Sequence, residues 1–235
     1  MKTQRFIGDF DLSQKSLEIS DKNFINQIKN VFRMKPGDLI FLVDGKSKEA
    51  ETKISEISAA GIKLEILNAK QNENESPVYG VLYAAILKKQ NFELVAQKAV
   101  EAGIKEITPI IAARTVKTEI NPERLRVIIK EAAEQSERGI LPKLNLHLSF
   151  KEALETAKEN SSNFIFDRIG LSSAKDIKLK PESKIGIFTG PEGGWTEEEL
   201  RLAKDYGFKI INLGKTVLRA ETAAIIASHL IENQG

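Results

Sequence analysis

The sequence predicts an α/β protein in which a small β-barrel domain precedes a larger domain built on a mostly parallel sheet. Three observations support this fold class. Short strand-like segments with turn signals fill residues 1–70, a polar stretch with no hydrophobic period occupies residues 71–77, and apolar strands alternate with amphipathic helices over residues 78–235. Near-continuous apolar strands separated by helices are typical of a parallel sheet covered on both faces.

The first segment is predicted to form a small β-barrel interrupted by one helix. Asp44-Gly45 and Ala60-Gly61 lie between strand candidates, where hairpin turns belong. In the helix, expected over Asp21–Phe32, apolar residues recur at helical spacing, and Pro36-Gly37 stops the run. The expected strands are Arg5–Phe10, Ser16–Ile19, Asp38–Val43, Ala50–Ile57 and Ile62–Leu67.

The segment after the polar linker is predicted to alternate strands and helices. Gly103 supplies the left-handed stop of the first helix. Ser149 with Glu152 matches a capping box, which predicts a helix start there. Thr196 with Glu199 matches the same pattern. The expected strands are Val78–Leu87, Glu106–Ala112, Asn163–Phe166, Lys184–Thr189 and Phe208–Leu213, and the expected helices are Asn91–Ala102, Pro122–Arg138, Phe150–Glu159, Glu197–Tyr206 and one from about Ala223.

Composition limits the function classes. A chain of 235 residues that is 41% hydrophobic has enough apolar material for a buried core. It has no cysteine, so disulfides and thiolate chemistry are excluded, and its two histidines are isolated, so no metal is expected. The sequence shows neither a signal peptide nor a membrane span, and we therefore expect a soluble, cytoplasmic protein. A net charge of +2 leaves a nucleic-acid partner open.

The first candidate ligand loop is Gly190-Pro191-Glu192-Gly193-Gly194-Trp195, which follows the strand that ends at Thr189. The carboxyl end of a parallel strand is where open α/β sheets bind ligands. Acidic residues Glu192 and Glu197–Glu199 crowd the next helix start, and their charge opposes a phosphate. A phosphate-free ligand with a positive centre fits better, and S-adenosylmethionine, a sulfonium, is of that kind. The alternative is that the glycines only make a tight turn and the acidic residues only cap the helix.

The second candidate loop, Leu213–Thr222, follows the next strand. Its apolar residues suit an adenine ring, and its charged pair, Arg219 and Glu221, suits a substrate. Its Gly-Lys-Thr run resembles the tail of a phosphate-binding loop, but Lys209 stands where that motif needs glycine, so a kinase or ATPase is disfavoured. The alternative is that Arg219 and Glu221 form a surface ion pair that caps the last helix.

The two loops are similar to the signature loops of the RsmE family, SPOUT-superfamily enzymes that methylate N3 of a uridine in small-subunit ribosomal RNA. Upstream segments resemble the family in the same order, so the resemblance covers nearly the whole chain: Arg5-Phe6, Val31-Phe32-Arg33, Lys35 to Asp38, Lys98 to Pro109, and Glu131 to Arg138 with Pro142. The chain departs from the family at Asn26-Gln27, where a His pair is frequent, and at Ala220, where threonine is frequent.

The resemblance implies a PUA-like β-barrel at residues 1–70 that binds RNA, and at residues 78–235 a SPOUT domain with a trefoil knot. It also implies a homodimer, S-adenosylmethionine as cofactor, and ribosomal RNA, within the small subunit, as partner. The residues then expected to hold the cofactor are Thr189, Gly190, Pro191, Glu192, Gly193, Leu213, Gly214, Val217, Leu218 and Ala223.

For catalysis, we expect Arg219 to stabilise the developing uracil anion and either Glu192 or Glu221 to accept the proton. The residues expected to contact RNA, each of which could instead be a solvated surface charge, are Arg5, Arg33, Lys88, Arg114 and Arg138. Two other functions stay open. One is a SPOUT ribose 2′-O-methyltransferase, although such enzymes usually have a Ser-Leu-Asn type final loop where this chain has Val217-Leu218-Arg219. The other is a non-catalytic RNA-binding module.

Overall fold

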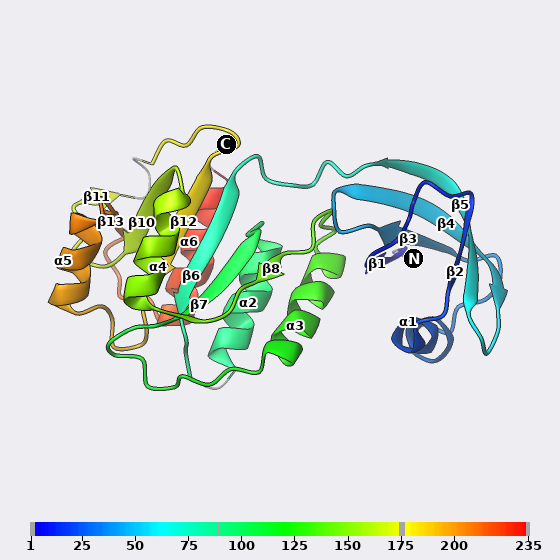
Figure 1. The fold of residues 1–235 in the computed structure, drawn as a ribbon, viewed down its shortest axis with the longest axis horizontal. Helices are drawn as coiled ribbons and strands as arrows, with labels where there is room; N and C mark the ends of the chain where they lie inside the picture. Colours follow the sequence, from blue (N-terminus) through cyan, green and yellow to red (C-terminus); the bar gives the residue numbers. More distant parts are fainter. Residues whose placement is uncertain (1–2, 89, 174–176, 234–235) are drawn as a thin grey trace. The chain divides into compact units, whose positions relative to one another are not determined.

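The computed structural model describes residues 3–88, 90–173 and 177–233. The chain divides into two compact units (Figure 1). One unit comprises Met1–Glu75 together with Ala133–Leu141, and the other comprises Ser76–Ala132 together with Pro142–Gly235. Among the described residues, no helix is long and apolar enough to cross a membrane.

The N-terminal unit is built on a five-stranded sheet in the order β1-β3-β4-β5-β2. The parallel pair β1–β3 starts this order, and the remaining neighbours are antiparallel. The expected hairpin turn between β3 and β4 contains Gly45 at a φ of 72°, a left-handed conformation that glycine adopts without strain. The strands are β1 (Gln4–Ile7), β2 (Ser16–Ile19), β3 (Leu39–Val43), β4 (Lys48–Ile57) and β5 (Ile62–Gln71), close to the predicted ones.

The helix predicted in this unit is present as two consecutive pieces. They are α1 (Lys22–Asn26) and the π-helical turn η1 (Gln27–Val31). Asp21 caps the start, because its carboxylate accepts the N–H of Phe24 at 2.8 Å. Phe24 and Ile28 are buried in the apolar core of the unit, as the helical spacing predicts.

The C-terminal unit is built on an eight-stranded sheet in which every pairing is parallel. The order is β11-β13-β10-β12-β6-β7-β8, and β9 also pairs with β7. The prediction of a mostly parallel sheet is therefore confirmed. The strands are β6 (Tyr79–Ala85), β7 (Glu106–Ile111), β8 (Lys143–Leu144), β9 (Leu148–Ser149), β10 (Ser162–Phe166), β11 (Ser172–Ser173), β12 (Lys184–Thr189) and β13 (Lys209–Asn212). The sequence missed β8, β9 and β11, because two residues are too few to show a period.

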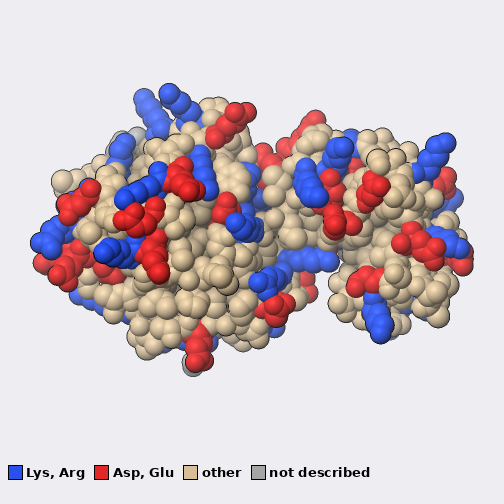
Figure 2. Space-filling view, viewed as in Figure 1, with Lys and Arg blue, Asp and Glu red and all other residues tan. Residues whose placement is uncertain are grey.

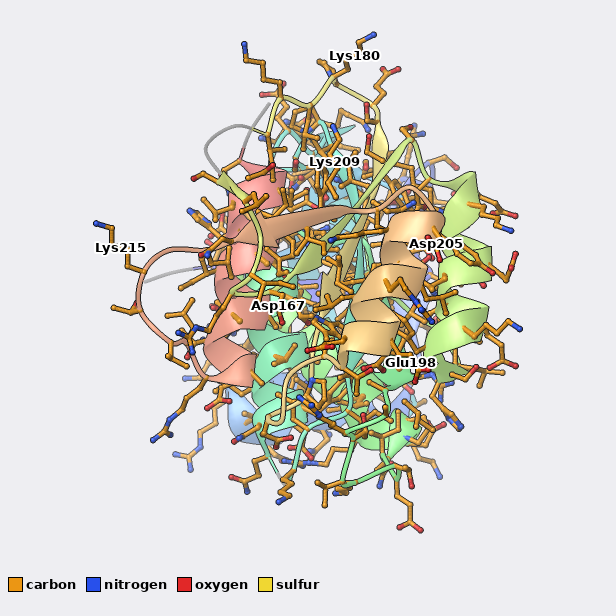
Figure 3. The ribbon with its side chains drawn as sticks, turned by 90° about the vertical axis from the view of Figure 1, so that its left-hand side faces the viewer. Asp167, Lys180, Glu198, Asp205, Lys209 and Lys215 are labelled. Atoms are coloured by element: carbon orange, nitrogen blue, oxygen red, sulfur yellow. The ribbon has the colours of Figure 1, made fainter. Side chains whose placement is uncertain are left out.

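Helices cover both faces of this sheet. They are α2 (Asn91–Glu101), α3 (Pro122–Gln135), α4 (Phe150–Thr156, continued by the 3₁₀ turn η2, Ala157–Glu159), α5 (Glu197–Asp205) and α6 (Ala220–Glu232). Figure 3 shows α4 and α5 on one side of the sheet and α2 and α6 on the other. The core between the sheet and the first pair of helices contains Phe188, stacked on Tyr83 with ring centroids 4.3 Å apart. Both predicted capping boxes are present, at Ser149 and at Thr196.

The last helix begins earlier than predicted. We expected a start near Ala223, but α6 begins at Ala220, and Arg219 is its N-cap residue with extended backbone. Ala223 donates its N–H to the carbonyl of Arg219 at 2.8 Å, which closes the first turn. The start was hard to predict because none of the usual cap residues Ser, Thr, Asp or Asn precedes it. The end of the predicted second loop is therefore helical, and Glu221 lies in the first turn of α6.

Candidate cofactor and substrate site

A cavity of about 650 Å³ opens at the carboxyl edge of the parallel sheet. Three strands that are neighbours in the sheet, β13, β10 and β12, end there. Because the carboxyl ends of parallel strands meet at one edge, the loops that follow these strands face a common space. The cavity is lined by residues 166–168, 190–195, 212–214, 216–221 and 223, together with Asn91 at the start of α2.

Both predicted loops line this cavity, as does the start of α6. Of the residues expected to hold a cofactor or substrate, those in the lining are Gly190, Pro191, Glu192, Gly193, Leu213, Gly214, Val217, Leu218, Arg219, Glu221 and Ala223. Thr189 does not line it. It is the last residue of β12, it is buried, and its backbone is paired between Phe166 and Ala84. It precedes the first loop directly, and its contact with the cofactor stays a prediction.

A third loop, after β10, was missed by the sequence analysis. Phe166, Asp167 and Arg168 line the cavity beside the two predicted loops. The signal was present, since the strand was predicted to end at Phe166 and two charged residues follow. What the sequence did not show is that β10 lies between β12 and β13 in the sheet, because this order differs from the order along the chain.

The first loop is held rigidly with its backbone exposed to the cavity. Gly194, at a φ of 68°, donates its N–H to the carbonyl of Pro191 at 2.9 Å and so closes a tight turn. Trp195 is buried, and its indole Nε1 donates to the carbonyl of Phe166 at 3.1 Å, which fastens the loop to β10. A Cβ on Gly190 would lie 3.1 Å from this indole, so the close packing favours glycine there.

Arg114 braces the same loop from outside. Its Nη1 donates to the carbonyl of Gly193 at 2.8 Å and to that of Trp195 at 3.2 Å. Glu192 is oriented by the segment that follows β6, since its Oε1 accepts the main-chain N–H of Lys88 at 2.9 Å. These contacts hold the loop before any ligand arrives, which lowers the ordering cost of binding.

The acidic residues after the loop divide into two groups. Glu199 is buried, closes the capping box with Thr196, and accepts the N–H of Ala113 at 2.9 Å. Glu197 and Glu198 are exposed in the first turn of α5, and Figure 3 labels Glu198 at this end of the helix. The helix start is thus already supplied with negative charge, which opposes a phosphate there.

The second loop ends in the first turn of α6. Gly214 has a φ of 139° and donates its N–H to Oδ1 of Asn212 at 2.7 Å. Arg219 is exposed at the N-cap of the helix, and Glu221 is half-buried in its first turn. In the described part of the chain these two side chains form no ion pair, so the alternative that they pair to cap the helix is wrong.

Two of the five predicted RNA contacts have structural partners instead. Arg138 is only 3% exposed, and its guanidinium donates to the carboxylate of Glu75 from Nε at 2.9 Å and from Nη2 at 2.8 Å. Arg5 is largely buried, pairs with Glu49 at 2.7 Å, and lies over the ring of Phe41. Because phosphate contacts require an accessible cation, we leave both out of the proposed RNA-binding residues.

The other three predicted RNA contacts, Arg33, Lys88 and Arg114, are exposed. Arg33 has a φ of 53°, a left-handed conformation that is uncommon for a residue other than glycine. On the face drawn in Figure 2, basic and acidic side chains are interspersed on each unit. Among the described residues, no group of three or more His, Asp or Glu is placed to hold a metal ion.

Comparison with known proteins identifies the family. A model described as an RNA methyltransferase domain matches residues 74–232, and one described as an RNA methyltransferase PUA domain matches residues 28–67. The ribosomal RNA small subunit methyltransferase E of Mesomycoplasma hyopneumoniae (strain 232) is 35% identical over 219 residues, which are 90% of this chain and 86% of the relative. The chain belongs to the ribosomal RNA small subunit methyltransferase E family.

Solved structures of similar proteins agree with this family. The methyltransferase E of Neisseria gonorrhoeae, bound to S-adenosyl methionine, is 32% identical with a TM-score of 0.86, covering 96% of this chain and 95% of that one. A methyltransferase from Legionella pneumophila in complex with the bound cofactor SAM is 28% identical with a TM-score of 0.88, covering 98% and 97%. The predicted combination of a PUA-like domain and a SPOUT α/β methyltransferase domain is confirmed.

Proposed function

We propose that this chain transfers the methyl group of S-adenosylmethionine to N3 of a uridine in small-subunit ribosomal RNA. The observation that carries the proposal is the cavity at the ends of β10, β12 and β13, which combines an apolar lining, free backbone groups and an exposed arginine. It belongs to a chain whose relative bound to S-adenosyl methionine matches it over 96% of its length.

The cavity fits the cofactor in chemistry. Leu213, Val217 and Leu218 offer apolar contact to an adenine ring, and the glycine-rich backbone of the first loop can approach a ligand closely. The bound cofactor supplies a methyl group activated by a sulfonium charge. Glu192 and Glu221 place negative charge in the same lining, which suits a cation, whereas a phosphate would be repelled.

Arg219 is the residue that we assign to the substrate. The guanidinium extends from the N-cap of α6 at the cavity wall and is exposed to solvent. Loss of the N3 proton puts negative charge on the uracil ring, and a planar guanidinium stabilises such charge by two parallel hydrogen bonds. Either Glu192, oriented by the Lys88 N–H, or Glu221, in the first helical turn, can accept that proton.

The experiment is methyl transfer from labelled S-adenosylmethionine to unmodified small ribosomal subunits and, in parallel, to free small-subunit RNA, with mass spectrometry of the nucleosides. We expect 3-methyluridine. A 2′-O-methylated nucleoside would instead establish the ribose methyltransferase. A lack of cofactor binding by calorimetry at millimolar concentration would contradict the proposal and favour the non-catalytic RNA-binding module.

We also propose that the enzyme acts as a homodimer in the cytoplasm and holds RNA with Arg33, Lys88 and Arg114. The apolar side chains of Ile169, Leu171 and Val217 are exposed, and burial of exposed apolar side chains is the usual driving force for subunit association. Light scattering after size exclusion should give twice the monomer mass, and a monomer would refute the dimer.

A further inference from the structure

Asp167 is a carboxylate in the cavity wall to which neither the sequence prediction nor the proposed mechanism gives a task. It follows β10 directly, it is half-buried, and it lines the cavity. In Figure 3 its label lies between α6 and α5. Since burying a charge costs free energy without a compensating partner, its place requires an explanation.

The loop that holds Asp167 is fixed against β13. The Asp167 N–H donates to the carbonyl of Ile211 at 3.0 Å, and Nδ2 of Asn212 donates to the carbonyl of Arg168 at 2.7 Å. A Cβ on Gly170 would lie 2.7 Å from backbone atoms of Ile211 and Asn212, so the loop approaches β13 as closely as glycine allows. The carboxylate is therefore held in place before a ligand binds.

One oxygen of this carboxylate has an internal role. Oδ1 of Asp167 accepts the N–H of Ile169 at 3.0 Å, which closes a short turn. Among the described residues, the other oxygen has no hydrogen-bond partner. A carboxylate accepts several hydrogen bonds, and two neighbouring hydroxyl groups are donors that match it.

We propose that Asp167 accepts hydrogen bonds from the two ribose hydroxyls of the bound cofactor. The inference rests on the proposed function, because the adenine is assigned to the apolar lining around Leu213. Through Ile211 and Asn212, Asp167 lies beside the start of that lining, and the ribose is the part of the cofactor joined to the adenine. The groups proposed to act on uracil, Arg219 and Glu192, belong to other loops of the cavity.

The test measures affinity by calorimetry and does not depend on methyl transfer. The variant Asp167→Asn keeps a side-chain oxygen for the Ile169 N–H but replaces the other acceptor by an amide donor. The probes are S-adenosylhomocysteine, its 2′,3′-dideoxy analogue, and 5′-methylthioadenosine, which keeps the ribose and lacks the amino-acid part. The control variant is Asp205→Asn, an exposed carboxylate at the end of α5.

We expect Asp167→Asn to weaken the binding of S-adenosylhomocysteine and of methylthioadenosine by on the order of ten- to a hundredfold. The affinity for the dideoxy analogue should stay unchanged. Asp205→Asn should change none of the three. If the variant binds S-adenosylhomocysteine more weakly but binds methylthioadenosine with unchanged affinity, Asp167 contacts the ammonium group of the amino-acid part, and the inference is overturned. The inference is also overturned if the affinity for the dideoxy analogue falls as much as that for S-adenosylhomocysteine, or if the affinity for none of the probes falls. If the unaltered protein binds none of the probes, the proposed function fails together with the inference.

Discussion

Arg219 occupies a position that does not favour the helix it begins. It is the N-cap of α6, and its side chain makes no capping hydrogen bond. The positive end of the helix dipole lies at the N-terminus, so a cation there is repelled, by a few tenths of a kcal/mol at an exposed site. A residue that weakens its own helix and faces a cavity is best explained by what it binds.

Replacing Arg219 by alanine should therefore separate binding from chemistry. We expect the single-turnover rate of methyl transfer to fall by about 10²–10³-fold, the usual effect of removing one donor to a developing anion. The dissociation constant for S-adenosylmethionine should stay the same, because the guanidinium acts on the uracil.

The matched control for this prediction is Arg201→Ala, an exposed arginine on α5. It should leave both the rate and the affinity unchanged. An Arg219→Ala variant that binds cofactor and keeps its full rate would refute the assigned role.

At the scale of elements, the start of α5 supports the site through the Thr196 capping box. The Thr196 hydroxyl accepts the N–H of Glu199 at 3.2 Å, while Oε2 of Glu199 accepts the Thr196 N–H at 2.8 Å. The other oxygen of Glu199 accepts the N–H of Ala113, in the loop after β7. One helix cap thus fixes the end of the glycine loop and the loop after β7 together.

We expect Thr196→Ala to lower the free energy of unfolding by about 0.5–2 kcal/mol, the range for loss of an N-cap side chain. Urea denaturation measures it, and Thr118→Ala, in an exposed loop, should have no effect. A Thr196→Ala variant as stable as the unaltered protein would contradict the importance of this cap.

A polar cluster joins three strands at the opposite, amino-terminal edge of the same sheet. Glu106 of β7 accepts hydrogen bonds from the Tyr79 hydroxyl of β6 at 2.8 Å and from Asn145 at 3.0 Å, and Lys184 of β12 is 3.7 Å away. Burial is the largest single influence on the Glu106 pKa and raises it, but these partners together outweigh burial, so the pKa is lowered. Burial and, after it, the hydrogen bond to Glu106 raise the pKa of Tyr79 to about 12.

This cluster gives a pH-dependent contribution to stability. Because the folded-state pKa of Glu106 lies below its ordinary value of 4.5, its contribution is present above that pH and is lost as the pH falls through the folded-state pKa. We expect Glu106→Gln to destabilise the fold by about 1–3 kcal/mol at pH 7. In urea denaturation at a series of pH values, the difference from the unaltered protein should shrink below pH 4.5. A difference that stays constant down to pH 2, or that Glu131→Gln on α3 reproduces, would contradict this.

At the scale of the whole molecule, the N-terminal unit is assembled from two separate stretches of chain. Residues 133–141 belong to this unit, although they follow residues 76–132 of the C-terminal unit in the chain. Glu75 holds residues 133–141 in this unit. Its carboxylate accepts hydrogen bonds from the Arg138 guanidinium and from the backbone N–H groups of Gly139 and Ile140, the last two at 3.0 Å. Arg138, predicted to bind RNA, thus has a structural role.

Removing this guanidinium should destabilise the fold, because it takes the cation away from the Glu75 carboxylate, which is only 12% exposed. We expect Arg138→Ala to lower the free energy of unfolding by about 3–5 kcal/mol. Amide hydrogen exchange should show lost protection in residues 133–141. The control, Arg126→Ala, removes a pair with Glu123 on the exposed side of α3 and should change stability by less than about 1 kcal/mol. Equal effects of the two variants would refute the structural role of Arg138.

Much of the fold followed from local patterns. The strands β2 and β12 and both capping boxes agree with the predicted residues, because period, turn residues and caps are encoded within a few positions. The start of α6 was missed because its N-cap position holds Arg219, which is not one of the usual capping residues. The burial of Arg5 and Arg138 was missed because their partners, Glu49 and Glu75, lie 44 and 63 residues away in the chain.

By itself, the sequence determined the alternation of strands and helices, the two glycine loops, and a loop charge that disfavours phosphate. Only the tertiary structure decided that β10 lies between β12 and β13, which brings Asp167 into the cavity with Arg219 and Glu192. Strand order depends on contacts between distant segments, and so does the trefoil knot that the family resemblance implies, so neither leaves a local pattern. The site exists because parallel strands that are distant in sequence end at the same edge of one sheet.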